Sequence, residues 1–147
     1  MSATTASEFF SKGMKALDHG HLYLARFCFK WAVTEERSPN HCSYLALSIA
    51  STSGEAMEAV SLAEEAVAAE PDDPLHYLRL GRVCLLIGDK ARAVEVFRTG
   101  ARFGGHPEII RELVALGSRK PAVFRQLPRN HPANKYLGLV LSRLGLR

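Results

Sequence analysis

The residues best suited to chemistry are spread thinly along this chain of 147 residues. The only closely spaced histidine pair is His19-x-His21, which flanks Gly20 in a segment typical of a turn. A protein zinc site generally needs about four nitrogen, sulfur or oxygen ligands, and no cysteine or acidic cluster completes one here. We therefore interpret both histidines as solvated turn residues and predict neither a metal site nor a cofactor.

The cysteines and the adjacent acidic pairs also lack the spacing of a reactive site. Cys28, Cys42 and Cys84 are odd in number and far apart, which excludes a CxxC metal pair and a disulfide framework. We expect these thiols to be small core residues, and Glu64-Glu65 and Asp72-Asp73 to be helix-surface and turn carboxylates. The glycines form none of the patterns that bind phosphate. Together these observations predict that the protein is not an enzyme.

The composition is that of a globular protein, with 47% hydrophobic and 23% charged residues. No stretch approaches the roughly 18 consecutive apolar residues of a membrane span. The polar start, Met1–Ser7, lacks the charged and apolar regions of a secretory signal. We therefore expect a cytoplasmic protein.

The net charge of +4 is unevenly distributed along the chain. Residues 1–112 hold all 15 acidic residues together with 12 basic ones, whereas the last 35 residues hold seven basic residues and no acid. The sequence therefore describes a slightly acidic body followed by a basic C-terminal segment.

Five sets of residues recur at intervals of 34, without insertions. These sets are Gly20, Gly54 and Gly88; Ala25, Ala59 and Ala93; Ala32, Ala66 and Gly100; Phe29, Ala63 and Phe97; and Gly13, Leu47 and Gly81. Between the turn glycines, apolar residues return every three or four positions, which predicts helices rather than strands. The expected helices cover residues 7–18, 22–36, 41–52, 56–69, 75–87, 90–103 and 107–117. The fold is therefore expected to be all-α.

These residues resemble the tetratricopeptide repeat (TPR) family, whose 34-residue helix-turn-helix has the pattern W-x2-L-G-x2-Y…A-x3-F…P. The third repeat matches best, with Tyr77-x2-Leu80-Gly81-x2-Cys84 followed by Ala93-x3-Phe97. The resemblance covers about residues 6–107 and implies a right-handed helical solenoid, in character a small bacterial-type TPR protein. We expect a flexible segment over 1–6, three repeats over 7–106 (about 6–39, 40–73 and 74–107), and C-terminal capping helices over 107–147.

The second repeat departs from this packing pattern. Small residues at Gly13 and Gly81 let paired helices approach, and a large residue, Phe29 or Phe97, fills the space beside them. Repeat two instead has Leu47 at the small position and Ala63 at the large one. We predict that the two changes compensate, since cores tolerate exchanges that conserve volume.

The last forty residues are expected to cap the repeat stack, whose end would otherwise expose an apolar face. Lys120-Pro121 interrupts the register, so residues 122–127 are predicted to form one helical turn and residues 133–145 a final helix. The alternative is that this basic amphipathic segment docks on an acidic protein, a membrane surface or nucleic acid. Its basic residues are too dispersed to favour nucleic acid or a membrane.

In TPR proteins the first helix of each repeat lines a concave groove that holds a peptide or a partner helix. Carried over by position, the resemblance places in this groove Phe10, Met14, Leu17, His41, Tyr44, Leu45, Ser48, Leu78, Arg79, Arg82 and Leu85. Leu45 and Leu78 are equally well explained as core residues, and the two arginines as solvated charges. The groove is expected to be an apolar trough, similar in character to that of type III secretion chaperones.

One TPR binding mode grips the C-terminal carboxylate of heat-shock chaperones with two lysines, two asparagines and an arginine. The matching positions here are Phe10, Met14, Leu45, Leu75 and Arg79. Only the arginine agrees, so we expect that clamp to be absent.

The predicted function is a non-enzymatic interaction module, either an adaptor or scaffold or a chaperone-like protein, with a partner peptide or helix in the groove. The alternative is a self-assembling structural protein, with repeats stacked end to end or joined through Trp31. An exposed Trp31 would be a candidate interface anchor, although partial burial beneath the N-terminal segment is an equal alternative.

Overall fold

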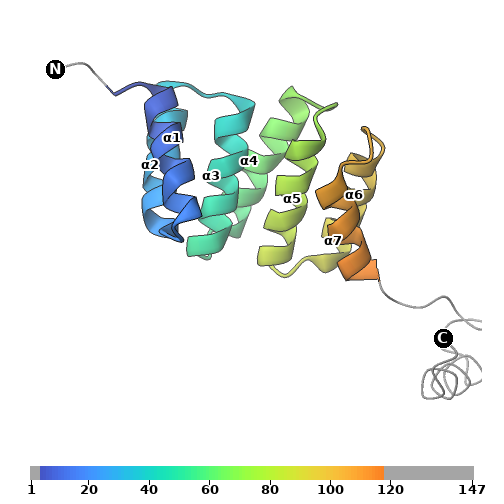
Figure 1. Cartoon of the computed structure of the whole chain (residues 1–147). Helices are drawn as coiled ribbons and strands as arrows, with labels where there is room; N and C mark the ends of the chain where they lie inside the picture. The colour runs from blue at the N-terminus through green and yellow to red at the C-terminus, as the bar shows by residue number, and fades with distance from the viewer. Residues whose placement is uncertain (1–3, 118–147) are drawn as a thin grey trace, which may run out of the picture. The chain divides into compact units, whose positions relative to one another are not determined.

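The computed structural model describes residues 4–117, and these form seven α-helices (Figure 1). The helices are α1 (Ala6–Asp18), α2 (Leu22–Glu35), α3 (Pro39–Thr52), α4 (Ala56–Ala69), α5 (Pro74–Leu86), α6 (Lys90–Ala101) and α7 (Pro107–Gly117). The described part of the chain contains no strand. The expected all-α class is confirmed, and the expected helix boundaries agree with the observed ones to within about two residues, the usual uncertainty of a helix end.

The helices pair into three hairpins, α1 with α2, α3 with α4, and α5 with α6. Figure 1 shows the odd-numbered helices in one layer and the even-numbered helices behind them. Helix α3 contacts α5 extensively, whereas α2 and α4 leave between them a cleft of about 450 Å³. The first repeat meets the second mainly through α2 and α3, and the third meets the second through α5, which contacts both α3 and α4.

The first helix begins at Ala6, within the segment 1–6 that we expected to be flexible. Thr5 and Glu8 form a capping box, in which each side chain bonds the backbone N–H of the other residue. This arrangement satisfies two N–H groups that a helix start otherwise leaves unpaired. The Thr-x-x-Glu pattern that signals it is visible in the sequence.

Two of the three turn glycines have the conformation that motivated their assignment. Gly20 and Gly88 have φ values of 73° and 87°, in the left-handed region where only glycine is free of strain. Gly54 does not, because its turn is closed differently: Ser53 is extended, and its hydroxyl bonds the Ile49 carbonyl and the Glu55 carboxylate.

Close contact between a glycine and a phenylalanine sets the spacing of two hairpins. A Cβ atom placed on Gly13 would lie 2.6 Å from Cε1 of Phe29, and one on Gly81 would overlap the ring of Phe97 in the same way. Both rings are fully buried. The predicted pairing of small and large residues is therefore confirmed for the first and third repeats.

In the second repeat, the compensation between Leu47 and Ala63 stays a prediction. Ala63 is fully buried, and Leu47 is partly buried and packs against the core.

The three cysteines are free and buried, as expected, and burial raises the pKa of each thiol. The thiols therefore act as small apolar residues in this core.

Ion pairs on the even-numbered layer connect each repeat to the next. Arg26 pairs with Glu55 at 2.5 Å, Arg37 pairs with Glu65 at 2.7 Å, and Arg92 pairs with Glu64. The adjacent acids Glu64 and Glu65 thus face opposite neighbours in the stack. Such exposed pairs contribute little stability individually but favour one register of stacking.

The last described helix, α7, continues the stack. Ile109 is fully buried, and its side chain packs against α6 at Gly100, where an added Cβ atom would lie 3.0 Å from Ile109 Cδ1. The predicted turn over 122–127 and final helix over 133–145 lie outside the described residues. Among those described, no helix is long and apolar enough to cross a membrane.

We predict that Phe97→Ala lowers the free energy of unfolding by about 3–5 kcal/mol, because the ring fills the space above Gly81 and its loss leaves a cavity. Denaturant titration followed by circular dichroism measures this change. Met57→Ala is the control, since Met57 is 89% exposed and its truncation should change stability by about 0.5 kcal/mol or less. Similar effects of the two variants would contradict the packing described here.

A second prediction concerns Leu47 and Ala63. Ala63→Phe should destabilise by overpacking, about 1–3 kcal/mol, and Leu47→Gly should destabilise by opening space. The double variant should lose at least about 1 kcal/mol less free energy of unfolding than the sum of the two single losses. Strict additivity in a denaturant double-mutant cycle would show that the two positions do not compensate.

Candidate functional site

A row of aromatic and basic side chains crosses the odd-numbered layer. The ring centroid of Phe10 on α1 lies 5.2 Å from that of Tyr44 on α3. Arg79 on α5 stacks on the same Tyr44 ring, with its Cζ 4.0 Å from the ring centroid. Three of the predicted groove residues, one from each repeat, are therefore brought together. Their contacts connect α1, α3 and α5 in a single line.

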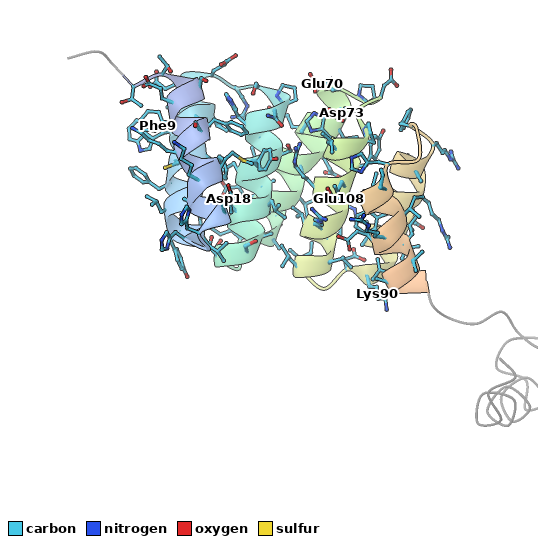
Figure 2. The ribbon with its side chains drawn as sticks, in the orientation of Figure 1. Phe9, Asp18, Glu70, Asp73, Lys90 and Glu108 are labelled. Atoms are coloured by element: carbon cyan, nitrogen blue, oxygen red, sulfur yellow. The ribbon has the colours of Figure 1, made fainter. Side chains whose placement is uncertain are left out.

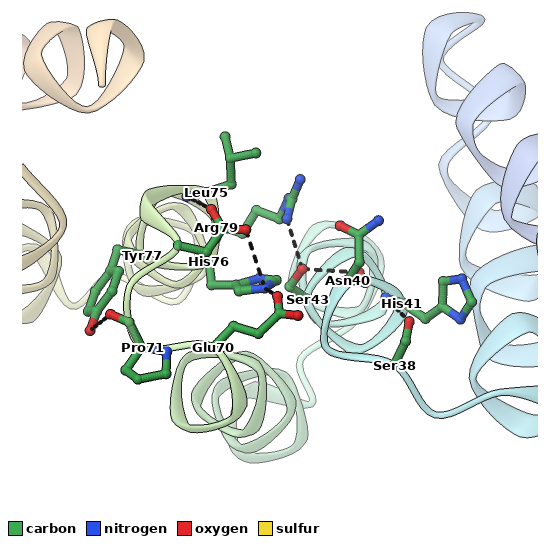
Figure 3. Close-up of polar contacts among 11 residues, drawn as sticks. Ser38, Asn40, His41, Ser43, Glu70, Pro71, Leu75, His76, Tyr77 and Arg79 are labelled. Atoms are coloured by element: carbon green, nitrogen blue, oxygen red, sulfur yellow. Dashed lines mark hydrogen bonds and ion pairs between the residues drawn. The ribbon is translucent and has the colours of Figure 1, made fainter. Parts of the chain in front are cut away.

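Arg79 is a buried cation with few partners. The residue is only 8% exposed, and its Nη1 donates to Ser43 Oγ at 3.1 Å (Figure 3). Its guanidinium also faces the Tyr44 ring. Within residues 4–117 no carboxylate lies within ion-pair distance of it. Buried charges in proteins are generally paired, and the guanidinium has five N–H donors. Arg79 therefore has unused capacity to bind an anion.

Six of the other predicted groove residues divide into two groups. Met14, Leu17 and Leu85 are partly buried and pack against the core, so each keeps some apolar surface exposed. In contrast, Leu45, Leu78 and Ser48 are buried, and the Ser48 hydroxyl donates to the Tyr44 carbonyl, so these three offer little surface to a partner.

His41 also contacts this row, and its imidazole is held in place by the backbone before α3. Its ring centroid lies 5.0 Å from that of Phe10, and Nδ1 is 2.8 Å from the Glu36 carbonyl oxygen. The backbone N–H of His41 donates to Ser38, which caps α3. The imidazole thus supports Phe10 from the start of α3.

Arg82 is placed differently from Arg79. Its Nε and Nη2 donate to Glu112 and Glu108 of α7, each at 2.8 Å. These bonds hold α7 against α5, and the bond from Arg82 lowers the pKa of the Glu108 carboxyl. The sequence holds an indication of this contact, because Glu108 and Glu112 are four residues apart and so lie on one face of α7. We did not predict it.

Glu70, Asp73 and His76 form the one cluster of metal-ligating side chains in the described part of the chain. His76 Nε2 lies 2.7 Å from Glu70 Oε2 (Figure 3). It lies 3.8 Å from Oδ2 of Asp73, which also caps α5. A histidine that binds a metal generally donates its other N–H to a supporting acceptor, but His76 Nδ1 has no partner within residues 4–117. The arrangement fits a structural link between the 70–73 loop and α5.

The remaining candidates lie on the surface. His19 and His21 are exposed, and His19 Nδ1 contacts the Lys15 carbonyl oxygen at 2.7 Å, as expected of turn histidines. Trp31 is 42% exposed and stacks on Phe9 at a centroid distance of 6.0 Å. It is therefore both partly buried beneath α1 and accessible.

Comparison with solved structures decides the fold. The first TPR domain of Spaghetti (RPAP3), bound to the HSP90 peptide SRMEEVD, superposes with a TM-score of 0.65 at 18% identity, over 80% of this chain and 96% of that one. The chain has the tetratricopeptide repeat fold. The Sgt2 TPR domain from Aspergillus fumigatus gives a TM-score of 0.63 at 20% identity, over 88% and 93% of the two chains.

Yeast Tom70 shares the TPR fold as well, with a TM-score of 0.57 at 20% identity over 95% of this chain, which spans 34% of Tom70. No family model and no curated protein sequence matches the chain. At these identities the likeness concerns the fold alone. The expectation of a small bacterial-type TPR protein stays a prediction.

We predict that Arg82→Gln lowers the free energy of unfolding by up to about 1 kcal/mol at neutral pH, a value reduced by the partial exposure of the pair. Because pairing lowers the pKa of Glu108, it stabilises the TPR stack above the ordinary glutamate pKa of about 4.3. This stabilisation is lost as the pH falls through the folded-state pKa, so the difference between variant and wild type should shrink below about pH 4.

Urea titration of both proteins between neutral and acidic pH measures this dependence. Arg98→Gln is the control, since Arg98 is exposed and no carboxylate of the described residues pairs with it. A difference that persists unchanged in acid would contradict an ionic origin.

Proposed function

We propose that the concave groove binds a segment of a partner protein that combines apolar side chains with a carboxylate placed against Arg79. The observation that carries this proposal is Arg79, a residue only 8% exposed whose guanidinium contacts Tyr44 and Ser43 and pairs with no carboxylate of residues 4–117. A carboxylate would complete the charge pairing that the described residues leave open, through charge-assisted hydrogen bonds. In this role the protein is a non-enzymatic adaptor, scaffold or chaperone-like module.

The surroundings of Arg79 define the rest of the ligand. Phe10 and Met14 lie where the carboxylate clamp has polar residues, and Tyr44 adds an aromatic face. These side chains favour apolar contacts on both sides of a single acidic group. The ligand is therefore expected to be an extended peptide or a helix with one acid among apolar residues, rather than a strongly acidic C-terminus.

The TPR fold supports this assignment, because the RPAP3 domain with the same architecture holds a peptide. Tyr44, Arg79, Phe10, Met14, Leu17 and Leu85 are the residues we assign to contact with the partner, with His41 as a support. The cytoplasm is the compartment that the sequence predicts for this interaction.

The test is selection of phage-displayed random peptides on the immobilised full chain. Wild type should enrich apolar peptides that carry an aspartate or glutamate at a fixed position. Replacing that acid by its amide in a synthetic peptide should weaken binding about 10- to 100-fold, the range for a hydrogen-bonded charged group. Arg79→Met should bind both peptides equally and weakly.

Arg79→Met is chosen because a buried ion replaced by a hydrophobic residue of similar volume often leaves stability unchanged or raised. Circular dichroism and thermal melting should therefore show an intact fold. Arg98→Met, on the exposed side of α6, is the matched control and should bind like wild type. Unaltered discrimination between acid and amide in Arg79→Met would refute the assignment.

A further inference from the structure

The cleft between α2 and α4, which are neighbours in the even-numbered layer, has an apolar floor (Figure 1). Its volume of about 450 Å³ lies within the range of roughly 300–1,000 Å³ that is typical of small-molecule pockets. The floor consists of Val33, Leu45, Ile49 and Leu62, each at most 8% exposed. The cleft therefore offers an apolar base to a ligand that enters from the solvent side.

Two ion pairs bound this cleft at opposite ends. Arg26, near the start of α2, pairs at 2.5 Å with Glu55, which directly precedes α4. Arg37, just after the end of α2, donates two hydrogen bonds of 2.7 Å to Glu65, near the end of α4. Each arginine is thus neutralised by a carboxylate across the repeat boundary. These four charges leave little capacity for a ligand.

The middle of the cleft carries one charge of each sign, and these two charges do not pair. Lys30 lines the cleft from α2 and Glu58 lines it from α4, and both residues are exposed. Neither belongs to any of the ion pairs formed within residues 4–117. The hydroxyl groups of Thr34 and Ser61 lie about one helical turn further along the same two walls.

The next repeat boundary shows the same two positions in a paired state. The residues 34 positions after Lys30 and Glu58 are Glu64 and Arg92, so the two charges are exchanged. Glu64 and Arg92 form an ion pair that connects α4 to α6, and the hollow that they line is smaller, about 310 Å³. Stacking of repeats therefore allows a direct pair at these positions. The separation of Lys30 from Glu58 is specific to the first boundary.

The charges that remain after pairing define the class of ligand. One ammonium group and one carboxylate are left, so the site is neutral and complements a zwitterion. A ligand carboxylate at Lys30 and a ligand ammonium group at Glu58 would each form a charge-assisted hydrogen bond. A simple anion would satisfy only Lys30, and a simple cation would satisfy only Glu58. Together with the apolar floor, these two charges match an α-amino acid that has an apolar side chain.

We propose that the cleft between α2 and α4 binds an apolar α-amino acid, with its carboxylate at Lys30, its ammonium group at Glu58 and its side chain on the floor of Val33, Leu45, Ile49 and Leu62. Both charged residues are exposed, so each ion pair contributes modestly, and the expected dissociation constant is on the order of 1 mM. The cleft and Arg79 lie on different helix layers and share no residue. The proposal is therefore independent of peptide binding in the groove.

The test is titration of the ¹⁵N-labelled full chain with free L-leucine, followed by the amide chemical shifts of the protein, which report binding in the millimolar range. Leucine should shift the signals of the residues that line the cleft, and the shifts should saturate. Two analogues each lack one charge: leucinamide has no carboxylate, and 4-methylpentanoate has no ammonium group. Each should bind about two- to fivefold more weakly than leucine, the range for the loss of one exposed ion pair.

Substitutions on the two walls test the assigned contacts. Lys30→Met should weaken leucine binding by the same factor as removal of the ligand carboxylate, and Glu58→Gln by the same factor as removal of the ammonium group. Lys90→Met is the matched control and should bind like wild type, because Lys90 is exposed at the start of α6, on the side of the stack away from α2 (Figure 2).

A charge-exchanged double variant closes the cleft without removing either charge. Lys30→Glu combined with Glu58→Arg reproduces the pair of Glu64 and Arg92, and it should abolish leucine binding while circular dichroism and thermal melting show an intact fold. The proposal is overturned if leucine shifts no signal of the cleft in the wild type, or if 4-methylpentanoate or leucinamide binds as well as leucine. Leucine binding by the double variant at wild-type strength would also overturn it.

Discussion

The contact of a phenylalanine ring with a glycine across each terminal hairpin is the constraint on which the rest of the structure depends. Phe29 over Gly13 and Phe97 over Gly81 leave no room for a Cβ atom, so the paired helices lie closer than side chains would otherwise allow. With the spacing within each hairpin set in this way, the second hairpin packs on the first through α3 against α2, and the third packs on the second through α5 against α3 and α4. The surface that carries the candidate site is the result of that packing.

The same ring connects the core to the groove. Phe29 lies 5.5 Å, between ring centroids, from both Phe10 and Tyr44. Tyr44 in turn carries the Arg79 guanidinium. The position of the cation is therefore determined by a chain of aromatic contacts that begins at the closest helix approach in the first repeat. Such support from packed side chains is what holds a binding group in one orientation.

The repeat could be predicted from sequence because its signals are local. Glycines at turns, alanines at close contacts and apolar residues at helical spacing placed every described helix within about two residues, and they identified the Phe29 and Phe97 contacts. The partners of individual charges could not be predicted in this way. Arg79 and Arg82 occupy similar groove positions in the pattern, yet Arg82 is paired by α7 and Arg79 is not. That difference depends on side-chain geometry between helices about 30 residues apart, which periodicity does not encode.

Two departures from ordinary burial remain once packing is accounted for. Arg79 is a largely buried charged residue at a position where an apolar residue would stabilise the fold at least as well. Trp31 and Phe27 are aromatic residues outside, where the other repeats carry polar ones. Sequences generally violate the rules of folding at sites that serve another purpose. The two departures lie on different helix layers, Arg79 on α5 and the exposed aromatic residues on α2.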